Sequence, residues 1–162
     1  MTIFNPLLWP YVSFKQTERL PQKPGIYFVI VNVTLKPGAQ VPVVPHLSVS
    51  MRNAIGRGEP LALCLYVGQT GNFNKRWSCL NGKSAHHKYM CVRVLVSVLA
   101  RFCTIGNLRI HYAPMRGGKG QKARLEKAEG ILIRQLRPPL NGLAPIFRKL
   151  SKKERSNVRR VA

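Results

Sequence analysis

The sequence predicts a single domain of mixed α and β structure, because strand-like and helix-like segments follow one another along 162 residues. Residues 25–33 form a continuous apolar run rich in β-branched and aromatic side chains, which is typical of a buried strand. Residues 121–136 repeat leucine and alanine at helical spacing and are followed by two prolines. These two segments are the clearest elements of the predicted fold.

Two further strands are predicted. Residues 61–68 are a second apolar run, and residues 107–113 alternate apolar and polar side chains, as a half-buried strand does. Residues 34–60 contain repeated proline and glycine. They predict a loop-like insertion inside a hairpin, with room for one short element.

Two further helices complete the pattern. Residues 72–80 predict a short helix, which ends before an Asn-Gly pair. Residues 89–102 suit a strand or a helix by composition. Arg93, Ser97 and Arg101 recur at every fourth position, which places them on one helical face and predicts a helix.

The charge of the chain identifies the class of partner. There are 27 lysines and arginines against 5 acidic residues, a formal net charge of +22, and aspartate does not occur. Such a chain is attracted to nucleic acids or anionic membranes. Because no run of 18 apolar residues exists, we expect no membrane association and nucleic acid as the partner.

The ends of the chain and its cysteines carry less information. The apolar N-terminal segment lacks the basic start of a secretion signal, so we expect a cytoplasmic, nucleoid-associated protein. Residues 1–146 are expected to form the domain and residues 147–162 a basic tail. Four cysteines without a C-x-x-C pair predict free thiols. A zinc site is the alternative, although its spacing matches no standard knuckle; its ligands would be Cys79, His86, His87 and Cys91.

Five polar residues in apolar surroundings have the chemistry to hydrolyse a phosphodiester. The guanidinium fork of Arg76 matches two phosphate oxygens, and Glu129 is suited to hold a divalent cation. Tyr27 and Tyr66 are candidate proton acceptors, provided that a nearby positive charge lowers a phenol pKa of about 10. Apart from Glu129, one of only five acidic residues, each residue alone has an ordinary explanation: tyrosines in a core, a solvated arginine, and a turn at Asn141.

Taken together and in order, these residues resemble the motifs of the GIY-YIG nuclease family. Gly25-Ile26-Tyr27 matches the first motif, and Tyr66-Val67-Gly68 differs from the second by one methylene. Arg76 follows the second tyrosine by ten residues, and Glu129 precedes Asn141 by twelve, as in the family. The resemblance covers residues 21–141.

The resemblance implies a small three-stranded antiparallel sheet flanked by helices, with an active site that holds one Mg²⁺ or Mn²⁺ ion. Tyr27 would take the proton of the attacking water, and Tyr66 would position the water or the phosphate. Arg76 would stabilise the phosphoryl charge, Glu129 would bind the metal, and Asn141 would brace the site. The implied function is a DNA endonuclease acting on duplex, branched or single-stranded DNA. The alternatives are an RNA nuclease and a basic nucleic-acid-binding protein without catalysis.

The sequence departs from the family at two positions. Many members have His or Tyr one helical turn after the arginine, where this chain has Leu80, and many have Lys or Arg where it has Gln69. We expect His86 or His87, and preferentially His87, to supply the missing group. The alternative is that both histidines only help to hold the substrate backbone.

Basic residues on either side of the motifs are predicted to contact phosphates. They lie near the predicted site, in the glycine-rich loop before the last helix, and in the tail: Lys75, His86, Lys88, Arg116, Lys119, Lys122, Arg148, Lys149, Lys152 and Lys153.

Overall fold

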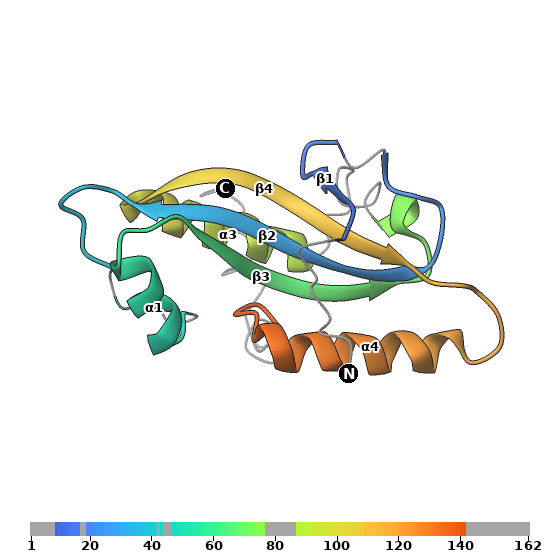
Figure 1. Ribbon diagram of the computed structural model, residues 1–162. Helices are drawn as coiled ribbons and strands as arrows, with labels where there is room; N and C mark the ends of the chain where they lie inside the picture. The colour runs from blue at the N-terminus through green and yellow to red at the C-terminus, as the bar shows by residue number, and fades with distance from the viewer. Residues whose placement is uncertain (1–8, 17–18, 42, 44–46, 77–86, 142–162) are drawn as a thin grey trace, which may run out of the picture.

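The fold is α+β, with one antiparallel sheet and helices on both of its faces (Figure 1). The computed structural model describes residues 9–16, 19–41, 43, 47–76 and 87–141, the backbone alone for 87–91. The elements are β1 (Tyr11–Ser13), β2 (Gly25–Leu35), α1 (Val49–Gly56), β3 (Leu61–Thr70), α3 (His87–Phe102), β4 (Cys103–Pro114) and α4 (Gln121–Leu136).

The sheet has four strands in the order β1-β4-β2-β3, so the prediction of three strands was wrong by one. The additional strand is β1, which has three residues and pairs with β4 through Val12 opposite Ile110. A strand this short shows no alternation that a sequence pattern could detect, and it is stabilised by a partner far along the chain. The three predicted strands are confirmed, and each is longer than predicted.

The central strand β2 sets the position of the two motif tyrosines. Tyr27 on β2 stands opposite Gly68 on β3 and Tyr112 on β4. A bulge in the pairing of β2 with β3 leaves Leu65 without an opposite residue. Leu65 and Tyr66 therefore both join the hydrophobic cluster that contains Tyr27.

The alternation of side chains along β2 divides the core into two clusters, one on each face of the sheet. On one face, Val29 and Val31 belong to the cluster that Leu95 and Leu99 of α3 complete. On the other face, the cluster contains residues of β2, β3 and α4: Ile26, Phe28, Ile30, Val67, Leu125 and Leu132. In Figure 1, α4 runs along the sheet on the side away from β1.

The helix predicted for residues 89–102 is confirmed as α3, and Arg93, Ser97 and Arg101 all lie on its exposed face. The helix predicted for 121–136 is confirmed as α4 with the same bounds. Of the helix predicted for 72–80, residues 73–76 are helical and the rest lies outside the described residues. Among the helices that the structure describes, none is long and apolar enough to cross a membrane.

The insertion between β2 and β3 contains one helix, α1, which confirms the short element expected there. The helix begins after Ser48, whose hydroxyl accepts a hydrogen bond from the Met51 N–H at 3.2 Å. Ile55 is 1% exposed and anchors the helix in the core of the α3 face. The insertion is therefore attached to the domain by a buried contact.

Candidate active site

Tyr27 and Tyr66 lie side by side on the α3 face of the sheet, with ring centroids 6.0 Å apart. They are 2% and 8% exposed, respectively. The ring of Tyr27 crosses β3 at Gly68, where a Cβ atom would stand 2.6 Å from the Tyr27 hydroxyl and 2.8 Å from the Tyr66 ring. The glycine of the second motif therefore provides the space in which the two phenols meet.

Arg76 comes from the helical turn that follows β3. Asn72 begins this turn, because its Oδ1 accepts a hydrogen bond from the Lys75 N–H at 3.0 Å. The Nε–H of Arg76 donates to the Tyr27 hydroxyl at 3.4 Å. The structure thus brings together the arginine and the first tyrosine, which are 49 residues apart in the sequence.

Phe73 anchors the turn that carries Arg76. It is fully buried, and its N–H donates to the Lys23 carbonyl at 3.1 Å. A Cβ atom at Gly25 would stand 2.5 Å from the Phe73 ring and would also clash with the carbonyl of Ala113. The glycine of the first motif therefore makes room for the residue that positions Arg76.

Glu129 reaches the site from α4 and is half-buried. The Nε2 of Gln69, the residue after the second motif, donates to the Glu129 Oε2 at 3.0 Å. Glu126, one turn earlier, is exposed and forms an ion pair with Lys122 at 3.8 Å. Of these two carboxylates, Glu129 is the one next to the motif residues.

Asn141 holds the outer edge of β3 next to Tyr66. Its Oδ1 accepts from the Val67 N–H at 2.8 Å, and its Nδ2 donates to the Val67 carbonyl at 2.8 Å. The N–H of Leu140 donates to the Leu65 carbonyl at 3.1 Å. Because β3 is an edge strand, the side-chain amide takes the place of a neighbouring strand at this point.

The electrostatics of the cluster keep both tyrosines protonated at neutral pH. Burial raises the pKa of Tyr27, and the adjacent Arg76 offsets this only in part. Burial also raises the pKa of Tyr66, and the neighbouring Tyr27 and Glu129 raise it further. Burial by itself would lower the pKa of Arg76, but the two tyrosines beside it raise that pKa above its ordinary value.

The carboxylate of Glu129 suits a hard cation that keeps several of its own water ligands. Mg²⁺ is commonly bound by one or two carboxylates, with water and substrate phosphate completing the octahedron. Glu129 is a half-buried carboxylate close enough to affect the pKa values of both tyrosines. Within the described part of the chain, no group of three His, Cys, Asp or Glu side chains is arranged to enclose a metal.

Comparisons with known proteins give one distant structural likeness. No protein-family model and no curated protein matches the chain. A solved structure that it resembles is the GIY-YIG N-terminal endonuclease domain of UvrC from Thermotoga maritima, bound to its catalytic divalent cation. The identity is 13%, the match covers 78% of this chain and 90% of that one, and the TM-score is 0.38. That domain belongs to the family whose motifs this sequence resembles, but a likeness this distant assigns no role to a residue.

Several predicted residues fall where the structure gives no side-chain position. His87 is the first residue of α3. The side chains of His87, Lys88 and Cys91 are not described. Other predicted residues lie outside the described ranges altogether: Cys79, Leu80, His86, Arg148, Lys149, Lys152 and Lys153. The catalytic histidine and the zinc alternative therefore remain predictions.

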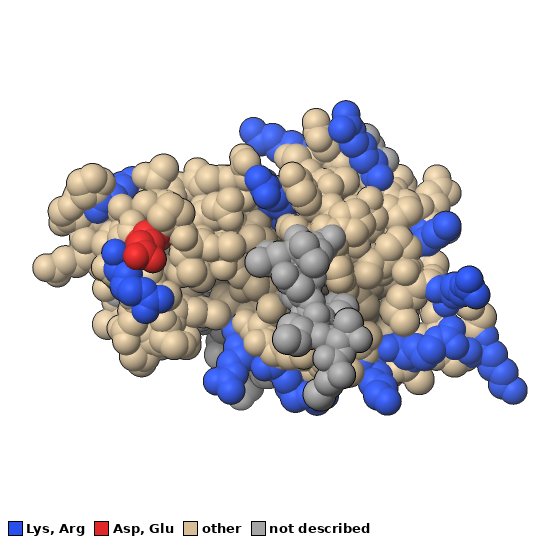
Figure 2. Space-filling model, viewed as in Figure 1, with Lys and Arg blue, Asp and Glu red and all other residues tan. Residues whose placement is uncertain are grey.

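The basic loop before α4 is on the surface, as predicted. Arg116, Lys119 and Lys122 are exposed, as is Lys75, the residue before Arg76. Figure 2 shows lysines and arginines gathered along the side of the molecule formed by α4 and the loop that leads to it. Sequence reasoning missed the role of Arg124, whose guanidinium donates to the carbonyls of Lys119 and Arg116 at 3.2 Å each and so folds the loop.

Proposed function

We propose that this protein is a divalent-metal-dependent endonuclease that hydrolyses phosphodiester bonds in DNA. The observation that carries the proposal is the convergence of Tyr27, Tyr66 and Arg76 over Gly68, with Glu129 approaching from α4. Phosphodiester hydrolysis requires charge stabilisation at the phosphorus, a proton acceptor for water and assistance to the leaving oxygen. These residues provide a candidate for each requirement.

Arg76 would bind the phosphoryl group that is attacked. Its guanidinium is planar and matches two phosphate oxygens at once. Because the two tyrosines raise its pKa, Arg76 stays charged at any working pH. Its bond to the Tyr27 hydroxyl would hold the phosphate next to the proton acceptor.

Tyr27, in its phenolate form, would accept the proton of the attacking water and become the phenol, and Tyr66 would hydrogen-bond the water or a phosphate oxygen. Since burial raises the pKa of Tyr27, the phenolate is scarce at neutral pH. Arg76 acts in the opposite direction and favours the phenolate. The base strength of Tyr27 therefore depends on the positive charge beside it.

Glu129 would hold the metal, and Gln69 would fix the direction of its carboxylate. A divalent cation bound there supplies Lewis-acid stabilisation of the leaving oxygen. Asn141 would keep β3, and with it Tyr66, in place through its two hydrogen bonds to Val67. Exposed lysines and arginines along α4 would bind the flanking phosphates.

The second candidate function is nucleic-acid binding without cleavage, and the net charge of +22 supports it as well as it supports a nuclease. Nicking of supercoiled plasmid DNA, with Mg²⁺ and with a chelator, separates the two. We expect nicked and linear products only with the metal. Retarded but intact plasmid under both conditions would favour the binding protein. In a parallel assay, cleavage of RNA but not of the plasmid would favour an RNA nuclease.

A further inference from the structure

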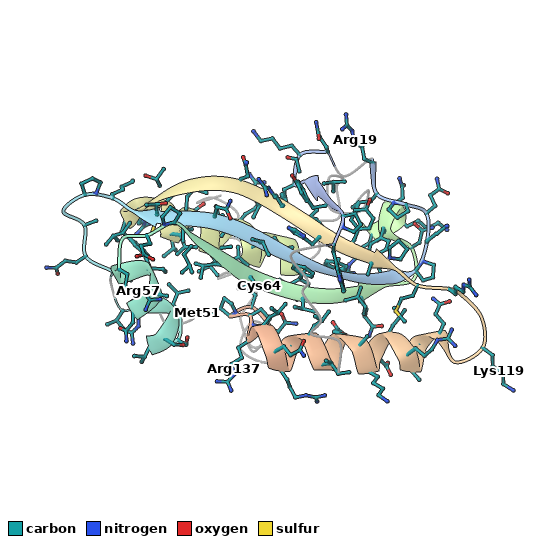
Figure 3. The ribbon with its side chains drawn as sticks, viewed as in Figure 1. Arg19, Met51, Arg57, Cys64, Lys119 and Arg137 are labelled. Carbon is teal, nitrogen blue, oxygen red and sulfur yellow. The ribbon has the colours of Figure 1, made fainter. Side chains whose placement is uncertain are left out.

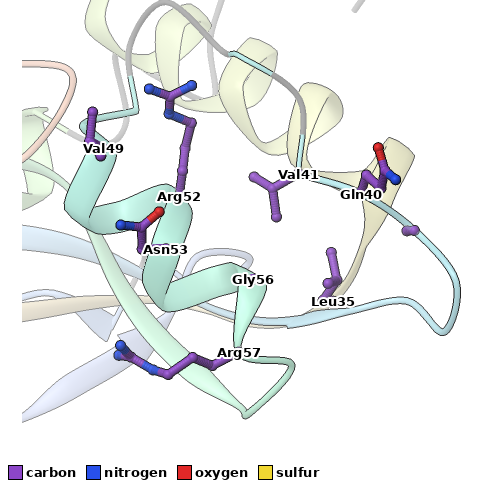
Figure 4. A pocket seen from close by; sticks show the side chains of 9 residues that line it. Leu35, Gln40, Val41, Val49, Arg52, Asn53, Gly56 and Arg57 are labelled. Carbon is purple, nitrogen blue, oxygen red and sulfur yellow. The ribbon is translucent and has the colours of Figure 1, made fainter.

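The insertion between β2 and β3 forms a cleft against the end of the sheet, away from the tyrosines. Figure 4 shows α1 on one side of it, and the end of β2 with the residues that follow on the other. The volume is about 700 Å³, which is within the range of small-molecule sites. The lining residues are Leu35, Ala39, Gln40, Val41, Val49, Arg52, Asn53, Gly56 and Arg57.

The cleft combines apolar walls with cationic ends. Leu35 and Val41 face α1 across it, and Val49 on α1 is 62% exposed. Figure 4 shows Arg52 extending from α1 and Arg57, the residue that follows the end of α1, extending in a different direction. Glu59 follows closely in the chain, but among the described residues it forms no ion pair with either arginine. The cleft thus offers apolar contact together with unneutralised positive charge.

Arg52 is the residue that points to a ligand. Its Nε is buried and has no hydrogen-bond acceptor among the residues that the structure describes. A guanidinium is always charged, and a buried donor without an acceptor is costly. An anionic oxygen entering the cleft would remove that cost, and a phosphate has the geometry that arginine binds best.

The distance between the cleft and the candidate active site suits one nucleic-acid strand that contacts both. The tyrosines lie where Tyr27 pairs with Gly68, and the insertion leaves β2 beyond the pair of Val33 with Leu61. Val33 lies six positions after Tyr27 on β2, which corresponds to about 20 Å along a strand. Figure 3 shows the exposed Arg137 at the end of α4 that is nearer to α1.

We propose that this cleft binds an unpaired nucleotide. Arg52 receives its phosphate, the base packs against Leu35, Val41 and Val49, and Asn53 and Gln40 offer hydrogen bonds to its edge. Apolar walls favour a base that has left the stack, because a duplex presents phosphates to a protein but no free base face. Nucleotide binding at the cleft does not depend on the proposed nuclease function. The further consequence, that the cleft selects DNA substrates with single-stranded or branched parts, rests on that function.

The test is binding of a fluorescent oligothymidylate to the full chain in EDTA, so that the result does not depend on catalysis. Arg52→Gln should weaken binding about tenfold at low salt and lower the slope of log affinity against log salt by about 0.7, one phosphate contact on a single strand. The matched control is Arg19→Gln, an exposed arginine far from the cleft (Figure 3), which should change the affinity less than twofold. Equal losses in the two variants would overturn the proposal.

A second variant and a second probe identify the ligand class. Val49→Asn, at an exposed position, should weaken binding without changing the salt slope, because it removes contact with the base and no charge. In methyl NMR spectra, the oligothymidylate should shift the signals of Leu35, Val41 and Val49. Inorganic phosphate that competes as well as the oligonucleotide would overturn the nucleotide assignment in favour of a simple anion site. An equal effect of Arg52→Gln on duplex DNA would overturn the requirement for an unpaired base.

Discussion

Gln69 donates a hydrogen bond from its Nε2 to the Oε2 of Glu129 at 3.0 Å, which ties the edge strand β3 to α4 at the candidate metal ligand. The bond fixes one carboxylate oxygen and thereby the orientation of the other. Groups that orient a metal ligand in this way affect metal affinity strongly when they are removed. Gln69, which departs from the family pattern, is therefore bonded to the candidate metal ligand of this site.

We expect Gln69→Ala to weaken the binding of the metal rather than to abolish cleavage. The Mg²⁺ concentration for half-maximal cleavage should rise at least about tenfold, while DNA binding in EDTA stays unchanged. Gln135→Ala, which changes an exposed glutamine of α4, the helix that carries Glu129, is the control. An unaltered Mg²⁺ dependence in Gln69→Ala would show that the contact does not orient a metal ligand.

Arg76→Lys should be nearly as damaging as Arg76→Ala. A lysine ammonium is a point charge and cannot contact Tyr27 and two phosphate oxygens in the way that the guanidinium does. Single-turnover cleavage of saturating DNA measures the effect. A Lys variant within about threefold of the wild-type rate would reduce the role of Arg76 to general electrostatic attraction.

The free energy of unfolding should fall as the pH rises above about 10. Burial raises the pKa values of Tyr27 and Tyr66 in the folded protein. Above the ordinary tyrosine pKa, the unfolded chain loses these protons while the folded protein keeps them, so alkaline pH favours unfolding. Urea unfolding between neutral and alkaline pH measures the trend. Tyr66→Phe should flatten it, because this variant removes one of the two buried phenols.

Asn141→Ala should destabilise the protein by about 1–3 kcal/mol, because it removes both hydrogen bonds to the Val67 backbone. Asn141→Asp should be at least as harmful, since a carboxylate oxygen would replace the donor that faces the Val67 carbonyl. Urea unfolding measures both, with the exposed Asn107→Ala as control. Wild-type stability in both variants would mean that β3 needs no support at this edge.

The regular elements were predictable because their signals are local. The helix α4 matched its predicted bounds, since apolar residues recur at helical spacing between Gly120 and the Pro138-Pro139 pair. The recurrence of Arg93, Ser97 and Arg101 at every fourth position likewise distinguished α3 from a strand. By contrast, β1 was missed because three residues carry no period, and only pairing with β4 makes them a strand.

The candidate site was predictable as a set of residues but not as an arrangement. Motif order indicated Tyr27, Tyr66, Arg76, Glu129 and Asn141. It could not indicate that Gly68 is the point where the Tyr27 ring crosses β3, because that depends on register. Nor could it pair Gln69 with Glu129, which are 60 residues apart, or indicate the buried Nε of Arg52 in the insertion. Contacts of this kind follow from the tertiary packing of distant segments.

The most direct test of the central claim compares Glu129→Ala with Glu126→Ala in single-turnover cleavage of DNA with saturating Mg²⁺. The two changes remove the same group from the same helix, but Glu129 lies beside the tyrosines whereas Glu126 pairs with Lys122 on the surface. Glu129→Ala should abolish cleavage and bind DNA as tightly as the wild type or more tightly, and Glu126→Ala should cleave at the wild-type rate. Normal cleavage by Glu129→Ala would contradict the assignment of the active site.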